Sequence, residues 1–401
     1  MDVIQQEFFV PVRYPVHFTT GLFSLSNVLL RDLIAASAAE DDVPARVAAV
    51  VDNGVERAHP ALLDAIGAYC VEHKHALTLA QPVLVVPGGE TIKNDRQHVD
   101  RILETINAGS LCRHSYLIAV GGGAVLDAAG FAASTAHRGI RLIRVPTTVL
   151  SQDDSAMGVK NGVNGFGKKN YLGTFAPPFA VINDVSFLST LSDRDWRGGV
   201  TEAVKAALIR DPEFFAFLER SAAALLDRDL SAMAQVIRRS AVLHLQHIAT
   251  GGDPFEQGSS RPLDFGHWAA HKLEQTTHHR LGHGEAVGVG IALDTTYSYL
   301  AGFLGEADWR RIIDLLMALG VEIYVPALHE HLDTPQDRGC ILGGLAEFQE
   351  HLGGRLTVML LEGIGRPFDV HDIRADLVTR SIDTLKTLKA QRAASSAKRA
   401  S

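Results

Sequence analysis

Metal-ligating side chains gather in the second half of the chain. His267 and His271 stand four residues apart in a stretch of helical apolar spacing, so both side chains leave one face of a helix. His283 follows in a glycine-flanked segment that can fold back, and Glu202 offers a carboxylate from another predicted helix. Imidazoles and a carboxylate around one open coordination position are typical of catalytic zinc. Each histidine alone is more often a core or solvated residue, so only the joint pattern predicts a metal site. The histidines at 278–279 lack this geometry and are expected at the surface.

Basic and polar residues near this set predict an anion site. Lys205 lies one helical turn after Glu202, where its ammonium can neutralise a phosphate beside the metal. The polar, glycine-dense segment 151–170 is compatible with a plain surface loop, but its acids, lysines and asparagine also suit an anionic polyol. Arg138, just before a predicted strand, is expected to join that anion site. The candidates in the segment are Asp153, Asp154, Lys160, Lys168, Lys169 and Asn170.

A glycine turn in the first half predicts a phosphate site of a different kind. The apolar run 116–120 leads into Gly121, Gly122 and Gly123 and then into an alanine-rich helix containing Asp127. Unpaired amides at a helix N-terminus, with no Cβ atoms in the way, favour a pyrophosphate. The spacing is not G-x-G-x-x-G, so the glycines alone fit a tight strand–helix turn equally well.

Three more predicted strand ends carry small or polar side chains. An aspartate at such an end suits ribose hydroxyls, although it also suits the cap of a helix. In a doubly wound sheet dinucleotides bind at the carboxyl ends of the strands, so the sequence predicts an NAD site there. The candidates are Asp52, Asn53, Glu90, Lys93, Thr147 and Thr148.

Elements able to position these residues follow from the periodicity. Short Val- and Ile-rich runs alternate with amphipathic stretches, a βαβ pattern that predicts an α/β, Rossmann-like parallel sheet. The expected strands are 47–52, 82–86, 116–120, 141–145 and 179–182, and the expected crossover helices include 61–75 and 95–108.

From about residue 184 the pattern becomes mostly α-helical. We expect an NAD-binding α/β domain over 1–183, a helical metal- and substrate-binding domain over 184–385, and a polar, disordered tail over 386–401. The expected helices of the second half lie in 194–250, 262–275, 284–304 and 306–319, with Gly320 as a C-cap and one late strand at 356–361.

Composition excludes several classes of protein. Lys and Arg total 38 against 46 Asp and Glu, a net charge of -8 that argues against nucleic-acid and membrane partners. Three widely spaced cysteines without a CxxC favour neither a disulfide framework nor a thiolate zinc site, which suits the cytoplasm. The N-terminus lacks the pattern of a signal peptide, and no apolar run is long enough to span a membrane.

Together these motifs resemble the sugar phosphate cyclases, the superfamily of 3-dehydroquinate synthase, from about Val50 to Gly365. GGGAVLD resembles the family's glycine turn with its acid, and VPTTVLSQDDSAMGVKNGVN resembles its segment from PTT to lysine. FLSTL, GGVTEAVK, DFGHWAAHKLE and HGEAVGVG match further family segments in the family's order. The resemblance implies NAD and a divalent metal, zinc or cobalt, as cofactors, and a homodimer.

The resemblance also assigns roles. It makes Glu202, His267 and His283 the metal set, with His271 a catalytic residue rather than a ligand. Lys205 accompanies the metal-binding glutamate. The substrate positions are Asp154, Lys160, Lys169 and Asn170, and Thr190 falls where the family contacts the cofactor; Lys169 is also a candidate cofactor contact.

Departures from 3-dehydroquinate synthases concern the substrate. Before the metal histidine that family typically has leucine-arginine, three residues and then asparagine, whereas this chain has Arg261, Pro262 and Asp264. Gln246 and His247 replace a substrate lysine. An acid in place of an amide and fewer cations disfavour an acidic heptulosonate and suit a neutral polyol with one phosphate. Together with an HLGG segment, these features resemble the branch that uses sedoheptulose 7-phosphate, of the 2-epi-valiolone synthase type.

The implied reaction is an internal redox cycle. Transient oxidation of a secondary alcohol by NAD⁺ permits β-elimination of phosphate, and reduction, ring opening and an aldol addition then close a carbocycle. Lys160, Lys205 and Arg138 would hold the phosphate, and His271 would shuttle protons. The alternatives are 3-dehydroquinate synthase itself, a metal-dependent polyol or glycerol dehydrogenase, and a non-catalytic NAD-binding protein.

Overall fold

The computed structural model describes residues 3–37, 43–166, 168–251, 255, 262–278 and 280–400. The chain forms two compact units, one from residues 1–147 with 158–186 and the other from 148–157 with 187–401. The segment 148–157 therefore leaves the first unit and joins the second, although it lies between two stretches of the first.

The first unit is built on a parallel sheet of seven strands. Its order is β1-β9-β6-β5-β2-β3, with β4 pairing the other end of β2 beyond β3. Because both faces are covered, strand interiors such as 47–51 are wholly buried and read as continuous apolar runs. The strands are β1 (Val16–Thr19), β2 (Ala45–Asp52), β3 (Leu77–Leu79), β4 (Leu84–Val86), β5 (Tyr116–Gly121), β6 (Arg141–Pro146) and β9 (Ala180–Asp184).

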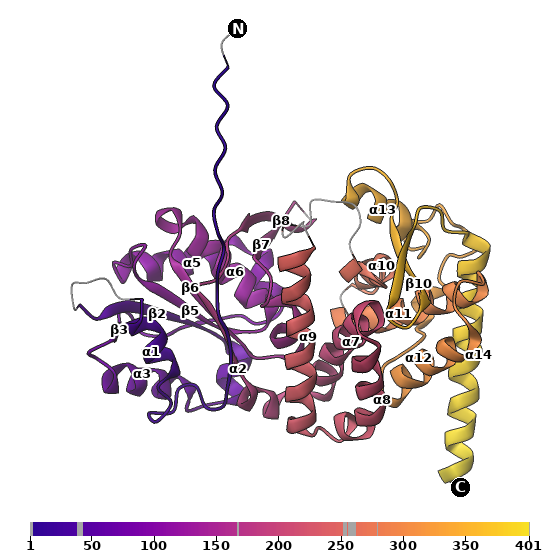
Figure 1. The fold of residues 1–401 in the computed structure, drawn as a ribbon, viewed down its shortest axis with the longest axis horizontal. Helices are drawn as coiled ribbons and strands as arrows, with labels where there is room; N and C mark the ends of the chain where they lie inside the picture. The colour runs from indigo at the N-terminus through magenta and orange to yellow at the C-terminus, as the bar shows by residue number, and fades with distance from the viewer. Residues whose placement is uncertain are drawn as a thin grey trace. The chain divides into compact units, whose positions relative to one another are not determined.

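Helices cover the two faces of this sheet. In Figure 1, α1 (Leu29–Ala35) and α3 (Leu62–Glu72) lie on one face, and α5 (Arg96–Ala108) and α6 (Gly123–Thr135) lie on the other. The chain leaves β2 toward β3 but leaves β5 toward β6, in opposite directions along the sheet. The carboxyl ends of β2 and β5 therefore form the topological switch point where such sheets bind ligands.

A two-stranded antiparallel hairpin follows in the same unit. β7 (Lys160–Gly165) pairs with β8 (Lys168–Phe175), with Lys160 opposite Phe175. Residues 151–170 were expected to form a polar loop, and the strands β7 and β8 correct that expectation. The run KNGVNG gives no apolar alternation, so its strand character depends on pairing with β8 rather than on local pattern.

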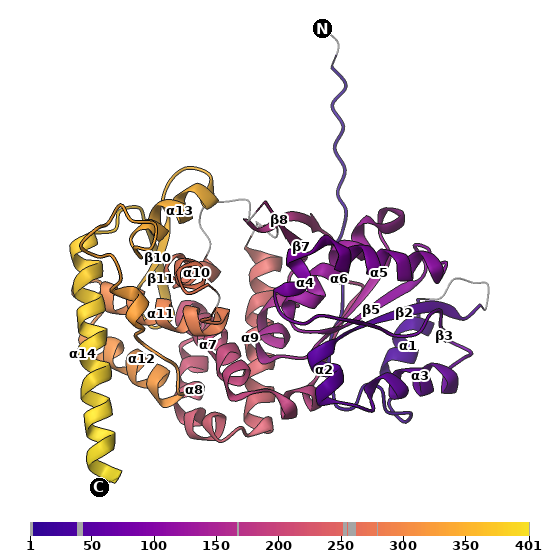
Figure 2. The same cartoon turned by 180° about the vertical axis from the view of Figure 1, so that it is seen from behind.

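The second unit is mostly helical around α11 (His283–Leu300). This helix is buried at Gly284 and from Ala286 to Ser298, and it packs against α7, α10, α12, α14 and β10. A helix that is apolar all round has no solvent face, as expected for the centre of a bundle. The other elements are α7 (Asp193–Arg210), α8 (Pro212–Leu226), α9 (Leu230–Thr250), α10 (His267–Thr276), α12 (Glu306–Ala318), α13 (Gly343–Leu352), β10 (Val358–Gly363), β11 (Arg366–Val370) and α14 (Ala375–Ala400). Figure 2 shows the same elements from behind.

The predicted class, a Rossmann-like α/β part with a mostly helical part, is confirmed. Gly320 follows α12 with a φ of 73°, the left-handed conformation of a C-terminal glycine. The expected disorder of the polar tail is corrected, because α14 continues to Ala400. Among the described residues, no helix is long and apolar enough to cross a membrane.

Candidate active site

Two close helix contacts in the second unit bring its candidate metal ligands together. At the first, α7 meets the start of α11: a Cβ on Gly284 would lie 2.1 Å from the backbone oxygen of Gly198. At the second, the start of α10 meets the middle of α11, because a Cβ on Gly290 would lie 2.0 Å from the backbone oxygen of Gly266. Only glycine permits backbones to approach this closely. These contacts carry Glu202 of α7, His267 of α10 and His283 of α11 toward one point.

The three side chains form a compact donor set. The Oε1 atom of Glu202 lies 3.6 Å from Nε2 of His283 and 3.9 Å from Nε2 of His267. One ligand atom from each of the three lies within 4.8 Å of the others. A carboxylate and two imidazoles at this spacing surround a volume suited to one divalent ion.

Neighbouring acceptors orient both imidazoles. Nδ1 of His267 is 3.1 Å from the carbonyl oxygen of Phe265, and Nδ1 of His283 is 3.3 Å from Oε2 of Glu274. An Nδ1–H donated to these acceptors leaves each Nε2 with its lone pair directed at Glu202. Carbonyl and carboxylate partners of this kind hold metal-binding histidines in other proteins.

Burial and charge favour a bound cation at this point. Glu202 is 1% exposed, and its Oε1 receives no hydrogen bond from the described residues. Its other oxygen pairs with Lys205, itself 3% exposed. A buried carboxylate oxygen without a donor is costly unless a cation satisfies it, so the residues present fit a divalent metal.

The charges around the set fix its protonation states. Burial lowers the pKa of His267 well below its usual value, and Lys205 and His283 lower it further, so this imidazole is neutral and able to ligate. For Lys205, burial acts to lower the pKa, but Glu202 and Asp154 outweigh it and raise the pKa above its ordinary value. The ammonium therefore stays charged beside the donor set.

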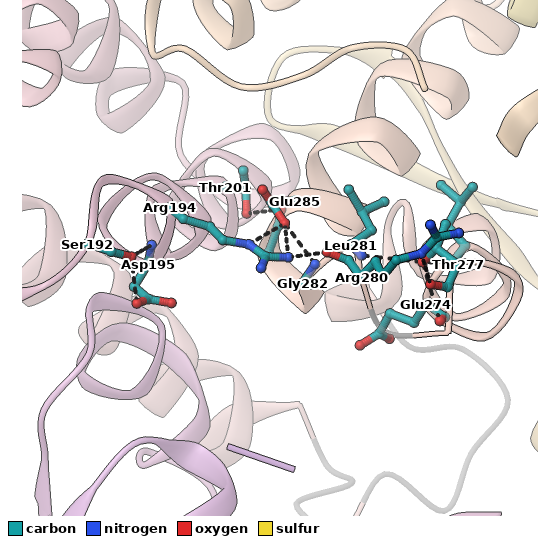
Figure 3. A network of polar contacts seen from close by, with 12 residues as sticks. Ser192, Arg194, Asp195, Thr201, Glu274, Thr277, Arg280, Leu281, Gly282 and Glu285 are labelled. Atoms are coloured by element: carbon teal, nitrogen blue, oxygen red, sulfur yellow. Dashed lines mark hydrogen bonds and ion pairs between the residues drawn. The ribbon is translucent and has the colours of Figure 1, made fainter. Parts of the chain in front are cut away.

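Figure 3 shows how the first turn of α11 is anchored. Arg194 of α7 donates from Nε to Oε2 of Glu285 at 2.8 Å and from Nη2 to the carbonyl oxygen of Arg280 at 2.5 Å. The same carboxylate accepts the backbone N–H of Gly282, the N-cap residue, at 2.8 Å. This network fixes the backbone of the residue between them, the candidate ligand His283.

His271, one turn after His267, lies beside the donor set. Its ring centroid is 5.6 Å from that of His267 and 6.2 Å from that of His283. His271, Glu274 and His283 form a second possible donor group that shares His283 with the first. The structure therefore brings His271 to the metal set, at a position where its imidazole can exchange protons with a ligand held there.

A pair of neighbouring acids in the same unit, the buried Asp153 and the half-buried Asp154, was only partly recognised from sequence. Asp154 accepts from Nδ1 of His244 at 2.7 Å, a partner that sequence reasoning missed because it lies on the distant helix α9. Burial acts to raise the pKa of Asp154, but His244 and Lys205 outweigh it and the pKa is lowered. Its neighbour Asp153 behaves oppositely: burial, Asp154 and Glu202 raise its pKa well above the usual value. The turn thus offers one charged and one neutral carboxyl group.

Other predicted residues of this unit are placed as follows. Asp264 lies half-buried in a short turn and its charge contributes to the raised pKa of Lys205. Thr148 bonds Ser151 at 2.8 Å and so caps the turn that carries Asp153 and Asp154. Thr190 is exposed and donates to the carbonyl oxygen of Phe187. The predicted Arg261 and the expected surface residue His279 lie outside the described residues.

In the first unit, the predicted nucleotide residues meet at the switch point. Asp52 ends β2 and accepts the backbone N–H of Gly54 at 2.7 Å. It therefore caps the helix Asn53–Ala58, which was the predicted alternative to a role in binding ribose. A Cβ on Gly88 would lie 2.3 Å from Oδ1 of Asp52, which shows how closely the loop after β4 crosses it. Asn53 accepts the backbone N–H of Gly88 at 3.1 Å. Gly121, whose carbonyl oxygen accepts the N–H of Thr147, completes the cluster.

Beside the glycine turn lies a network of charged and amide side chains. Gly122 is the N-cap of α6, whose first helical residue is Gly123. Lys93, 3% exposed, donates to Oδ2 of Asp127 at 2.8 Å and also to Oδ1 of Asn170. Nζ of Lys169 lies 3.8 Å from Oε1 of Glu90. The hairpin residues Lys169 and Asn170 are therefore held by elements of the predicted cofactor side.

Arg138 does not join these residues. It lies just before the amino end of β6, whereas the glycine turn follows the carboxyl end of the neighbouring parallel strand β5. There it lines a cavity of about 500 Å³ with Cys112, Arg113, His137 and Gly139. This placement does not support the predicted role of Arg138 in the anion site of the loop.

The matches to known proteins agree with this architecture. Residues 83–198 match the family model for the N-terminal part of 3-dehydroquinate synthase, and residues 199–336 match the model for its C-terminal part. The 3-dehydroquinate synthase of Paracoccus denitrificans is 35% identical over 88% of this chain and 94% of its own length. The chain belongs to the 3-dehydroquinate synthase family, within the sugar phosphate cyclases.

Solved structures give a more particular likeness. The 2-epi-5-epi-valiolone synthase of Streptomyces hygroscopicus, with NAD⁺ and Zn²⁺ bound, superposes with a TM-score of 0.82 at 28% identity, over 96% of this chain and 99% of that one. A 2-deoxy-scyllo-inosose synthase superposes with a TM-score of 0.70 at 24% identity, which shows a shared fold.

Proposed function

We propose that this protein is an NAD- and metal-dependent sugar phosphate cyclase whose substrate is sedoheptulose 7-phosphate. The observation that carries the cyclase assignment is the donor set of Glu202, His267 and His283 with the charged Lys205 against it. A polyol dehydrogenase needs no such phosphate-binding cation, and the family membership favours the cyclase over it.

The residues present assign the parts of the chemistry. Glu202, His267 and His283 would hold a divalent metal, zinc or cobalt, which when bound acts as a Lewis acid on a substrate hydroxyl. NAD⁺, held at the switch point by the glycine turn and the residues around Asp52, supplies a reversible hydride acceptor. The valiolone synthase with both NAD⁺ and Zn²⁺ bound supports this pair of cofactors.

The chain's own groups do the remaining work. Lys205 holds an anionic group beside the donor set, because its charge persists at all physiological pH values. His271 moves a proton at the reacting carbons, since an imidazole changes charge near neutral pH. Asp154, kept ionised by His244 and Lys205, accepts hydrogen bonds from substrate hydroxyls. Lys160, exposed at the start of β7 in the first unit, is a further candidate cation for a phosphate.

The choice of substrate depends on the charge around Lys205. Asp264 lies close enough to raise the pKa of Lys205, and a substrate carboxylate there would meet a like charge. On α9, Gln246 and His247 stand where the family resemblance places a substrate lysine, so that position offers no lysine ammonium to a second anionic group. A polyol with a single phosphate suits this arrangement. The structural likeness to the valiolone synthase supports the same branch.

A second candidate, 3-dehydroquinate synthase, has its own support. Curated relatives with that name are 34–40% identical to this chain, a higher identity than that of the valiolone synthase. The deciding experiment compares kcat/KM for sedoheptulose 7-phosphate and for the acidic heptulosonate phosphate, with NAD⁺ and zinc present and the products identified by NMR. The proposal expects a cyclitol from the first substrate and a preference of at least about a hundredfold, the size of one unfavourable buried charge contact. Dehydroquinate formed with the opposite preference would assign the second function.

A further inference from the structure

Arg144, in the middle of β6, is a fully buried cation that none of the predicted roles uses. It is 1% exposed, and its guanidinium reaches out of the sheet to the hairpin β7–β8 of the same unit. Nη1 donates to the carbonyl oxygen of Gly158 at 2.6 Å. Nη2 donates to the carbonyl oxygen of Lys160 at 3.0 Å and to Oδ1 of Asn161 at 2.7 Å. One planar fork thus binds three acceptors at the base of the hairpin.

Holding a cation here is unfavourable in itself. Burial lowers the pKa of Arg144, and the nearby Asp127 and Tyr14 only partly offset that effect. Buried ion pairs are often replaceable by apolar residues without loss of stability, so stability alone is a weak reason for this arginine. Its geometry, aimed at the residues around Lys160, indicates a role in placing that segment.

Asp127 links this arginine to the predicted cofactor side. The carboxylate lies in the field of Arg144 and accepts from Lys93 at 2.8 Å. Lys93 also donates to Asn170 on the second strand of the hairpin. Arg144 therefore holds the hairpin at Asn161 of β7, and Lys93 holds it at Asn170 of β8. Asp127 interacts with both cations, through a hydrogen bond from Lys93 and through the charge of Arg144.

The hairpin also leaves little room for a different position. A Cβ on Gly130 of α6 would lie 1.8 Å from Oδ1 of Asn161, so the amide sits directly on the helix. Its Nδ2 donates to the carbonyl oxygen of Ala176 at 3.1 Å, beyond the end of β8. Asn161 of the hairpin thus contacts helix α6 at Gly130 and accepts a hydrogen bond from Arg144 of strand β6. In contrast, the side chain of Lys160 itself is exposed.

We propose that Arg144 is a positioning residue that holds the β7–β8 hairpin so that Lys160, Lys169 and Asn170 present their side chains to the phosphorylated substrate. This part of the inference rests on the proposed function; the mechanical part, that Arg144 fixes the hairpin, does not. We place Arg144 itself outside the substrate site, because it is 1% exposed and its guanidinium donates to Gly158, Lys160 and Asn161.

The test replaces the guanidinium and measures hairpin and enzyme separately. Arg144→Gln removes the charge and the fork, and Arg144→Lys keeps the charge without the fork. The matched control is Arg141→Gln on the same strand, whose guanidinium binds the Tyr116 hydroxyl instead at 2.6 Å. Hydrogen–deuterium exchange is followed in peptides covering β7 and β8, with and without NAD⁺.

Loss of even one of the three charge-assisted hydrogen bonds of Arg144 predicts amide exchange in the hairpin that is about tenfold faster or more in Arg144→Gln. Exchange in the central strands and in Arg141→Gln stays at the wild-type rate. The KM for the sugar phosphate rises by about tenfold, whereas the dissociation constant of NAD⁺ changes by less than about twofold. Arg144→Lys gives intermediate values for both exchange and KM.

Two outcomes separate the possible failures. Hairpin exchange at the wild-type rate in folded Arg144→Gln protein overturns the inference, whatever the activity. If the wild type converts neither sugar phosphate but the hairpin loosens, the positioning stands and the proposed function falls. Should Arg144→Gln not fold, Asn161→Ala removes only one acceptor and must still accelerate exchange in the same peptides; unchanged exchange there overturns the inference too.

Discussion

Replacing Glu202 by glutamine removes the only anionic member of the donor set while keeping its shape. Two consequences follow from the geometry. The lone pairs of His267 and His283 lose the carboxylate that completes the site, so the affinity for zinc falls. Lys205, 3% exposed, loses the partner that holds its charge. Removing one member of a buried ion pair costs about 3–5 kcal/mol, and the remaining amide oxygen places this variant at the lower end.

Zinc binding also stabilises the folded protein, and the size of this effect can be calculated separately. Zinc at a hundred times its dissociation constant stabilises the native state by about 2.7 kcal/mol, which for a unit of this size raises Tm by about 5–10 °C. Wild-type protein treated with a chelator should lose this increment and regain it on adding zinc. Glu202→Gln should show no increment and should retain less than about a tenth of one zinc per chain.

The assay combines metal analysis with thermal unfolding, with and without zinc. The matched control is Glu219→Gln, which removes an exposed carboxylate paired with Arg311. An exposed pair contributes about 1 kcal/mol or less, so this variant should keep both its zinc and its thermal shift. Stoichiometric zinc in Glu202→Gln, with a wild-type shift, would refute the assignment of Glu202 as a ligand.

Three further predictions test neighbouring features. Glu274→Gln, which weakens the acceptor of His283 Nδ1, should reduce zinc affinity by about 10–100-fold without unfolding, as measured by competition with a chelator. His244→Asn should raise the pKa of Asp154, since that histidine helps to lower it, and so shift the acidic limb of the kcat/KM profile to higher pH; an unmoved limb would show that ionised Asp154 is not needed. Cys112 should be the first cysteine alkylated by iodoacetamide at pH 7.5, because it is exposed and backbone and Ser115 hydrogen bonds lower its pKa; modification of a buried thiol first, detected by peptide mass spectrometry, would contradict this.

Sequence patterns predicted the features that depend on residue type and local period. Five strands of the first sheet, β2, β4, β5, β6 and β9, are apolar runs because both faces of the sheet are covered, and they were placed to within a few residues. β1 and β3 were missed, since runs of four and three residues give too little pattern to recognise. Spacing alone suggested that His267 and His271 share an ion, and the family resemblance replaced His271 with Glu202. The structure brings Glu202, His267 and His283 together, and it leaves His271 at their side.

Features that depend on tertiary contact were missed. Arg144 reads as one polar residue in a strand, and its three acceptors lie 14 to 17 positions further along the chain. His244 lies 90 positions from Asp154, with no local signal linking them. The hairpin β7–β8 lacks apolar alternation, so only pairing reveals it. The tail was expected to be disordered, but its alanine, lysine and arginine content favours the helix that the structure shows.

The most direct test of the proposed reaction is the amount of phosphate and of NADH formed per sugar consumed. Purified protein with zinc, sedoheptulose 7-phosphate and a catalytic amount of NAD⁺ is monitored for inorganic phosphate and for absorbance of NADH. The account predicts one phosphate released per sugar consumed, a carbocyclic product and no net NADH. Accumulation of NADH in step with sugar consumption, or consumption without phosphate release, would contradict it.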